Sequence, residues 1–155
     1  MGAATARACR FRGVHDFACV VLVDRRGRLL MQERDEHPVI DPEKWGLCGG
    51  HLEPGEDPLT GAVRELEEET GVRLPAEELE LVEQLQVFHE GYGTWDQMTV
   101  FAAGVDLDDG DIVCGEGRQI VFVEPDRVLD LDLTGSARRV LPGFLSGPIY
   151  RRLSA

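Results

Sequence analysis

The sequence predicts one domain of the α+β class, with a mixed β-sheet and helices packed on it. The chain has 155 residues, a usual length for a single domain, and no internal boundary is visible. Its residues are 43% hydrophobic and 29% charged, as in ordinary globular proteins. Segments typical of strands precede and follow one helical segment, an order that does not fit a doubly wound βαβ repeat. We therefore expect a single domain over residues 1–155, in which residues 1–16 form an N-terminal arm.

The first half of the chain begins with two predicted strands. Residues 17–24 and 29–32 are apolar and Gly27 lies between them, so an antiparallel pair joined by a turn is expected. Residues 34–44 are polar, contain two prolines and predict a loop. Residues 45–50, with the sequence WGLCGG, predict a short strand that runs into a glycine turn.

A helix is predicted between two clear boundary signals. Asp57 followed by Pro58 is typical of a helix start, and Gly71 is typical of a helix end. The spacing of its apolar residues predicts a buried stripe, formed by Leu59, Ala62, Val63, Leu66 and Thr70. At 3.6 residues per turn, three carboxylates share another face roughly 120° away, those of Glu65, Glu68 and Glu69.

Three further strands and two helices are predicted in the second half. The expected strands are residues 79–88, 97–103 and 119–124, and the expected helices are residues 126–131 and 136–145. Two glycine-containing segments separate the strands, residues 91–93 and residues 106–117.

The net charge of −13 argues against a polymeric nucleic acid as partner, because proteins that bind its backbone are basic. Residues 35–83 hold 15 acidic and three basic residues, and so carry most of the excess. This concentration has two explanations, a solubilising surface or a site for a cation.

The cysteines and the apolar segments predict a cytoplasmic protein. Cys9, Cys19, Cys48 and Cys114 lack the spacing of zinc ligands, which predicts free thiols in a reducing compartment. The longest apolar run, residues 17–23, is too short to cross a membrane, and no export signal is visible. We therefore expect no membrane partner.

The acidic helix face and the loop before it suit a divalent cation. Two carboxylates about 4 Å apart repel by roughly 4 kcal/mol at an effective dielectric constant of 20, so three on one face need solvent or a cation between them. The loop adds Glu53 and Glu56 between glycines. Mg²⁺ is typically held by a few carboxylates together with substrate phosphate. The segment therefore predicts a metal site beside a phosphate.

The same residues match a known sequence pattern. The pattern G-x5-E-x7-R-E-U-x-E-E-x-G-U, where U is aliphatic, is met at every defined position, by Gly50, Glu56, Arg64, Glu65, Leu66, Glu68, Glu69, Gly71 and Val72. This is the Nudix box, and the chain resembles the Nudix hydrolase family, in particular its small MutT-like members. Cys48 departs from many members, which have proline before the two glycines.

The resemblance implies a fold, a cofactor and roles for the box residues. The fold would be the family's α/β/α sandwich, and the cofactor Mg²⁺ or Mn²⁺. Arg64 would orient the catalytic glutamate and pair with Glu56, and Gly50 and Gly71 would shape the loop–helix–loop. The metal ligands would be Glu65, Glu68 and Glu69, with the Gly49 carbonyl as an additional one. The family leaves the general base open between Glu65 and an acid on a later loop. Glu116 is the candidate for that later acid, as a base or as an additional metal ligand.

Residues outside the box are expected to bind the substrate. Arg34 suits a phosphate, and the rings of Phe88, Tyr92 and Trp95 suit stacking on a base. Two markers of family subgroups are not met: a proline about 16 residues after the box for ADP-ribose, and a tyrosine there for diadenosine polyphosphates. The histidines are expected at the surface or in loops, with His51 able to contact substrate: His15, His37, His51 and His89.

We therefore expect a metal-dependent pyrophosphohydrolase of a nucleoside diphosphate linked to another moiety. The first substrate class is a nucleoside triphosphate, oxidised ones included, which would give the monophosphate and pyrophosphate. Two alternatives stay open, a hydrolase of nucleotide sugars or specialised-metabolite phosphates, and a catalytically silent nucleotide sensor. Family members are often homodimers, so a homodimer is also expected here.

Overall fold

A computed structural model describes residues 15–155 of the chain. Most of the expected N-terminal arm, residues 1–14, lies outside the described residues, as does Cys9. The first strand, β1 (Asp16–Val23), already includes Asp16, which the sequence had assigned to the arm.

A seven-stranded mixed sheet forms the middle layer of the fold. Its strand order is β3-β2-β1-β6-β5, and in addition β4 pairs with β1 and β7 with β2. β1 and β6 are parallel and the other strand pairs are antiparallel. The strands after β1 are β2 (Leu29–Glu33), β3 (Trp45–Gly46), β4 (Cys48–His51), β5 (Glu80–His89), β6 (Thr94–Gly104) and β7 (Gln119–Val123).

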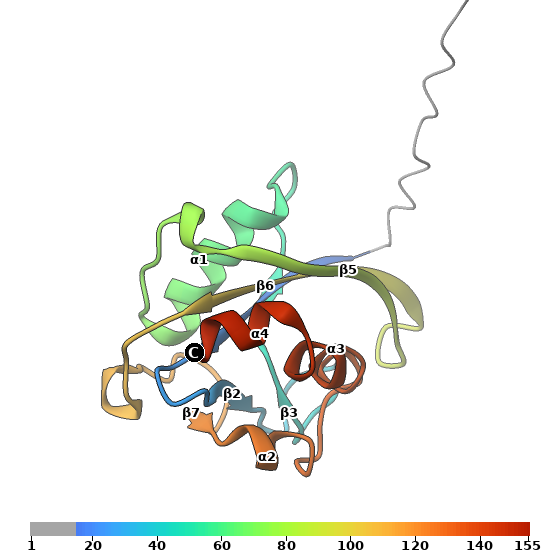
Figure 1. The fold of residues 1–155 in the computed structure, drawn as a ribbon. Helices are drawn as coiled ribbons and strands as arrows, with labels where there is room; N and C mark the ends of the chain where they lie inside the picture. Colours follow the sequence, from blue (N-terminus) through green and yellow to red (C-terminus); the bar gives the residue numbers. More distant parts are fainter. Residues whose placement is uncertain (1–14) are drawn as a thin grey trace, which may run out of the picture.

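Helices cover both faces of the sheet, which gives the sandwich that the sequence predicts. Alternate residues of β1 enter different hydrophobic clusters because successive strand side chains point to opposite faces. Ala18, Val20 and Leu22 pack with helix α1 (Pro58–Thr70), whereas Phe17, Cys19, Val21 and Val23 pack with helix α3 (Gly135–Leu145). Figure 1 shows α1 on one side of the long β5–β6 hairpin, and α3 with α4 (Pro148–Leu153) on the other.

Helix α1 has the boundaries that the sequence predicts. The Asp57 side chain accepts a hydrogen bond from the Thr60 amide at 2.8 Å, and Pro58 occupies the first turn. Gly71 ends the helix with φ of 73°, a left-handed conformation that glycine adopts without steric cost. In the predicted stripe, Ala62, Leu66 and Thr70 are buried, and Leu59 and Val63 are half-buried.

The structure corrects the expected glycine turn after Trp45. Residues 45–51 form two short strands, and Gly49 and Gly50 lie inside β4 rather than in a turn. Both glycines pair with β1, opposite Cys19 and Ala18. The pairing of β4 with β1 determines this conformation. Because the two strands are far apart in the sequence, the two adjacent glycines alone do not reveal it.

The helices of the second half differ in length from the prediction. The expected helix at residues 126–131 is the shorter α2 (Pro125–Val128), because the next amides, those of Asp130 and Leu131, bond three residues back in tight turns. Helix α3 agrees with the expectation, with Thr134 as its cap. Helix α4 and two short 3₁₀ turns, η1 (Ala76–Glu78) and η2 (Asp109–Asp111), were not predicted.

Two further sequence expectations can be compared with residues 15–155. Cys19, Cys48 and Cys114 are free thiols, as predicted. Burial raises the pKa of Cys19 to about 12 and also raises the pKa of Cys48, so both thiols stay protonated at neutral pH. None of the described helices combines the length and apolarity that crossing a bilayer requires.

Candidate active site

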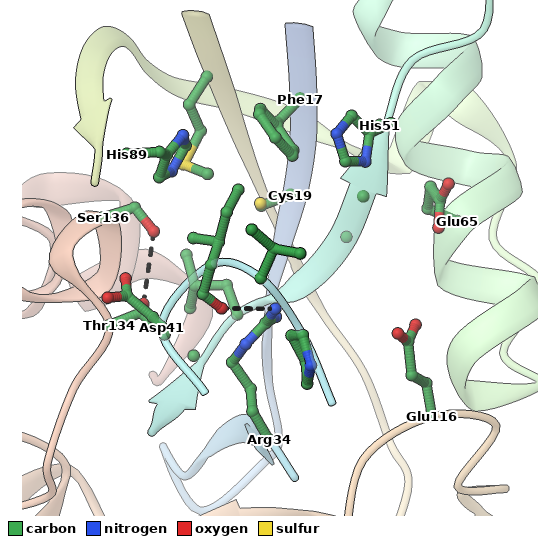
Figure 2. Close-up of a pocket in the computed structure, with 18 of the residues that line it drawn as sticks. Phe17, Cys19, Arg34, Asp41, His51, Glu65, His89, Glu116, Thr134 and Ser136 are labelled. Carbon is green, nitrogen blue, oxygen red and sulfur yellow. Dashed lines mark hydrogen bonds between the residues drawn. The ribbon is translucent and has the colours of Figure 1, made fainter. Parts of the chain in front are cut away.

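One cavity of about 330 Å³ opens on the face of the sheet that carries α3. Its floor comes from β1 and β6, and its walls from β4, the loop at residues 38–41 and the start of α3. Figure 2 shows Glu65 and Glu116 on one side of it and His89 and Ser136 on the other. The cavity therefore connects acidic residues from α1 and from a later loop with a wall of different chemistry.

Arg64 is the centre of the charge network on α1. Its guanidinium donates two hydrogen bonds to the Glu56 carboxylate, at 2.8 and 2.7 Å. It also donates to Glu65 at 2.9 Å, to Glu68 at 3.2 Å and to the His51 carbonyl at 3.1 Å. The hydrogen bonds from Arg64 lower the pKa of Glu56 to about 2, so this carboxylate stays ionised at neutral pH.

Glu69 is the most buried acid of the box. Its side chain is only 5% exposed, and one carboxylate oxygen accepts a hydrogen bond from the Gly49 amide at 2.9 Å. Burial raises its pKa to about 8, and the nearby charges of Glu116 and Glu65 act in the same direction. A bound cation would remove this cost of ionisation.

The two glycines of β4 give the α1 carboxylates their path to the cavity. A β-carbon on Gly50 would lie 2.7–2.9 Å from the Glu65 carboxylate, so this carboxylate occupies the space that a side chain would fill. A β-carbon on Gly49 would overlap the backbone of Ala18 and Cys19. Burial raises the pKa of Glu65 against the opposing effect of its hydrogen bond from Arg64.

Glu116 is brought to α1 by backbone contacts. The amides of Val113 and Gly115 donate to the carbonyls of Thr70 and Glu69, at 2.9 and 2.8 Å. The Gln32 side chain donates to the Glu116 carbonyl at 3.0 Å and fixes the loop from the other side. The structure therefore places Glu116, Glu65 and Glu69 along the same cavity although about fifty residues separate them in sequence.

The predicted metal ligands lie near one another, but their carboxylate oxygens do not converge on one common position. Glu68 is exposed and bonded to Arg64, and Glu69 is bonded to Gly49. Within residues 15–155, the only trio of possible ligand atoms that all lie within 4.8 Å is Asp35, Glu36 and His37. That trio belongs to a mostly exposed turn in which the His37 amide donates to Asp35 at 3.0 Å.

The structure separates the four predicted substrate residues into two pairs. Arg34 and Tyr92 line the cavity. The Arg34 guanidinium donates to the Ile40 carbonyl at 3.1 Å, and its buried Nε has no partner. Phe88 and Trp95 contact each other across β5 and β6, with ring centroids 5.5 Å apart, and lie outside the cavity lining on the exposed surface.

The expectation that all histidines lie at the surface or in loops is wrong for His89. His89 is the last residue of β5, is 5% exposed and lines the cavity. Leu85, Val87 and His89 alternate on the buried face, so the two-residue period of the strand would have indicated it. His51 is exposed at the cavity edge, His37 is exposed and His15 is half-buried.

Sequence reasoning also missed parts of the wall. Phe17 comes from β1 and Ser136 from the start of α3, and the loop at residues 38–41 covers the cavity. None of these belongs to the box or has a spacing that points to a ligand. Their role depends on tertiary contacts between distant segments.

Comparison with known proteins agrees with this geometry. The NUDIX domain family model matches residues 14–144. The chain is 34% identical over 132 residues to a CMP-5'-(N-acetyl-N-hydroxy-3-aminopropyl)phosphonate hydrolase of Streptomyces rubellomurinus, over 84% of this chain and 60% of that protein. It is 39% identical over 54 residues to an RNA pyrophosphohydrolase of Rhodospirillum rubrum, over 35% of this chain and 30% of that protein. The chain thus spans less than two thirds of both curated relatives.

A solved structure supports the fold independently of sequence. The MutT protein from Methanosarcina mazei Go1 is similar with a TM-score of 0.68 and 20% identity, over 90% of this chain and 91% of that chain. The family match, the sandwich fold and the arrangement of the box residues agree. The chain therefore belongs to the Nudix hydrolase family.

Proposed function

We propose that the protein is a Mg²⁺- or Mn²⁺-dependent pyrophosphohydrolase of a nucleoside diphosphate linked to another moiety. A nucleoside triphosphate, normal or oxidised, is the first substrate class. The observation that supports this most is one cavity lined by the carboxylates of Glu65, Glu69 and Glu116, by the rings of Phe17 and Tyr92 and by Arg34.

The donor set of this cavity fits a hard divalent cation. Three carboxylates approach one another closely enough for Glu116 and Glu65 to disfavour ionisation of the buried Glu69. Hard cations prefer such carboxylate oxygens, and a cation would relieve this repulsion. Glu65, Glu69 and Glu116 would hold it, with Glu68 and the Gly49 carbonyl as further ligands. When bound, it would supply positive charge against the phosphoryl oxygens and acidify the attacking water.

The protein's own residues would orient the reactants. Arg64 holds the Glu65 carboxylate at 2.9 Å and keeps it directed at the cavity. Glu65 or Glu116 would accept the proton of the attacking water, since both carboxylates line the same cavity. Arg34 would bind a phosphoryl oxygen through guanidinium N–H groups that the Ile40 carbonyl does not occupy, since the residue lines the cavity.

A second substrate class has one specific observation in its favour. The Streptomyces rubellomurinus relative is named as a hydrolase of a CMP-linked phosphonate, and its similarity covers 84% of this chain. A nucleoside monophosphate joined to a phosphonate or phosphate metabolite is therefore the second candidate. The same bond class would be cleaved, and only the leaving group would differ.

The first test measures turnover of a nucleotide panel with Mg²⁺ or Mn²⁺ and compares two neighbouring variants. Glu69→Gln removes a charge from the cavity and should lower kcat by about a hundredfold or more. Glu67→Gln is the matched control on the same helix. Glu67 does not line the cavity, and its carboxylate forms an ion pair with Arg73 at 2.8 Å. It should keep near-normal activity.

Two results would contradict the proposal. One is the absence of hydrolysis for every panel member, including nucleotide sugars and CMP-linked phosphonates. The other is equal loss in both variants while circular dichroism shows an unchanged fold. Tight nucleotide binding without turnover would favour the nucleotide sensor instead.

A further inference from the structure

His89 and Asp96 form a buried pair at the end of the β5–β6 hairpin. The His89 Nδ1 lies 2.6 Å from one Asp96 carboxylate oxygen. The other oxygen accepts from the His15 amide at 3.1 Å and from the Thr94 hydroxyl at 2.9 Å. Asp96 is fully buried, and these three hydrogen bonds hold its carboxylate without any contribution from a ligand. None of the catalytic roles above uses it.

The state of Asp96 determines which nitrogen of His89 carries a proton. Burial opposes ionisation of Asp96, but the hydrogen bonds from His89 and Thr94 outweigh it and hold its pKa below the ordinary value. An ionised carboxylate only accepts hydrogen bonds, so Nδ1 must donate. In the neutral imidazole, Nε2 then keeps its lone pair and is an acceptor.

The Nε2 atom is free to contact a ligand. Within the described residues, no hydrogen bond to Nε2 is present, and the His89 ring lines the cavity. Figure 2 shows His89 on the side of the cavity away from Glu65 and Glu116. A ligand whose phosphates lie at the carboxylates would therefore present its other end to His89.

The surroundings of His89 suit a planar heterocycle. The Phe17 ring meets His89 edge-on with centroids 5.1 Å apart, and the Tyr92 ring lines the same cavity. Aromatic faces favour stacking on a base, and a fixed acceptor beside them selects the edge of that base. Exocyclic amino groups of cytosine and adenine donate there, whereas the oxo groups of uracil and hypoxanthine accept.

We propose that His89, held by Asp96, accepts a hydrogen bond from the exocyclic amino group of the nucleobase and thereby selects amino-bearing over oxo-bearing nucleotides. The inference rests on the proposed function for its substrate class. It adds to that function a specificity-determining residue, His89, and a positioning residue, Asp96.

Matched nucleotide pairs test the inference. The assay compares kcat/KM for CTP with UTP and for ATP with ITP, all at one fixed pH. The wild type should prefer CTP over UTP and ATP over ITP, in each case by about tenfold or more. With UTP or ITP, two acceptors would face each other and the buried Nε2 would stay without a hydrogen bond. The preference should reside mainly in KM.

The variant Asp96→Asn should reverse the preference. Its amide oxygen can still accept from the His15 amide and the Thr94 hydroxyl, while its amide nitrogen donates to Nδ1. The imidazole proton then moves to Nε2, which becomes a donor and favours UTP and ITP. A structural role alone would lower both rates without changing their ratio.

A second measurement does not depend on the variant folding. Nitrogen-15 NMR of the wild type should show the tautomer protonated at Nδ1, and the Nε2 resonance should shift with CMP but not with UMP. Calorimetry of the two monophosphates should give the same order of affinity. These readings remain valid if no nucleotide is hydrolysed, so they separate this inference from the proposed function.

Three results would overturn the inference. They are equal kcat/KM within both pairs in the wild type, an active Asp96→Asn variant with an unchanged ratio, and a His89 tautomer protonated at Nε2. The last result is decisive even when Asp96→Asn is insoluble.

Discussion

At the scale of single residues, Arg64 explains why the box contains so many acids on one short helix. One guanidinium has five N–H donors, and here it serves three carboxylates and a carbonyl. A lysine at this position would supply only three donors without the planar fork. The Arg64 guanidinium therefore holds these three carboxylates in place by itself, without a metal ion.

The pair between Glu56 and Arg64 predicts a defined loss of stability in acid. The folded pKa of Glu56, about 2, lies below its ordinary value of 4.5, so the folded protein binds the proton more weakly than the unfolded chain. Glu56→Gln should cost about 2 kcal/mol at pH 7, because it removes charged hydrogen bonds. The stability gap to wild type should stay constant above about pH 5 and narrow as the pH falls towards about 2.

Denaturant unfolding at several pH values checks this expectation. Glu53→Gln is the control, because Glu53 is exposed and its nearest oxygen is 3.8 Å from Arg64. A gap between wild type and Glu56→Gln that widens in acid would contradict the assignment.

At the scale of elements, strand β4 acts as a spacer between α1 and the cavity. Its two glycines lack side chains at the points where Glu65 and Glu69 approach the sheet. The strand therefore determines which helix carboxylates reach the cavity. This explains why glycine is needed in a strand, where it otherwise costs conformational entropy.

Alanine substitutions in β4 should separate catalysis from folding. In Gly50→Ala the new β-carbon meets only the end of the flexible Glu65 side chain, so activity should fall at least tenfold while the fold persists. In Gly49→Ala it meets the Ala18 backbone, so stability should fall by about 1–3 kcal/mol. Gly110→Ala is the control, because a β-carbon there has no neighbour within 4 Å. Thermal unfolding and turnover measure both effects, and full activity in Gly50→Ala would argue against the placement of Glu65.

At the scale of the whole molecule, the cavity joins segments from nearly the full described chain. The acids come from α1 and residue 116, the floor from β1 and β6, and the cover from residues 38–41 and α3. A ligand that bridges these parts binds only the folded state, so its affinity adds directly to global stability.

Mg²⁺ should therefore raise the melting temperature of the wild type. At a concentration a hundredfold above Kd the gain is about 2.7 kcal/mol, which corresponds to several degrees for a domain of this size. Glu69→Gln should lose most of this shift. Differential scanning calorimetry with NaCl at matched ionic strength gives the control, and an equal shift in both proteins would contradict a site at Glu69.

The sequence predicted the local parts of the fold well. Helix α1 has both of its signals in adjacent residues, Asp57–Pro58 before it and Gly71 after it, and these capping contacts form as expected. The double glycine was misread because its conformation depends on pairing with β1. Helix α4 was missed since it is short and is tied by the Tyr150 hydroxyl to the Gly27 carbonyl, a contact over 123 residues.

In the candidate site, too, local sequence patterns could be predicted, whereas features that depend on tertiary contacts could not. The box residues could be predicted because their spacing is itself the signal, and Glu116 because of its position in a later loop. Their roles stay predictions, and the structure shows that Glu65, Glu69 and Glu116 line one cavity. The buried pair of His89 and Asp96 was missed, because each residue alone looks like an ordinary hairpin residue. Only the closing of the hairpin brings the imidazole and the carboxylate together.

The parallel pairing of β1 and β6 affects how the polypeptide matures on the ribosome. Asp16 lies opposite Gln97, so the central ladder joins residues 81 positions apart. Helix α1 is synthesised well before β6, so its carboxylates leave the ribosome before the β6 part of the cavity floor exists. Such long-range contacts slow folding. A nascent chain stalled before residue 94 therefore lacks the β6 part of the cavity floor, and the cavity is complete only after β6 has left the exit tunnel.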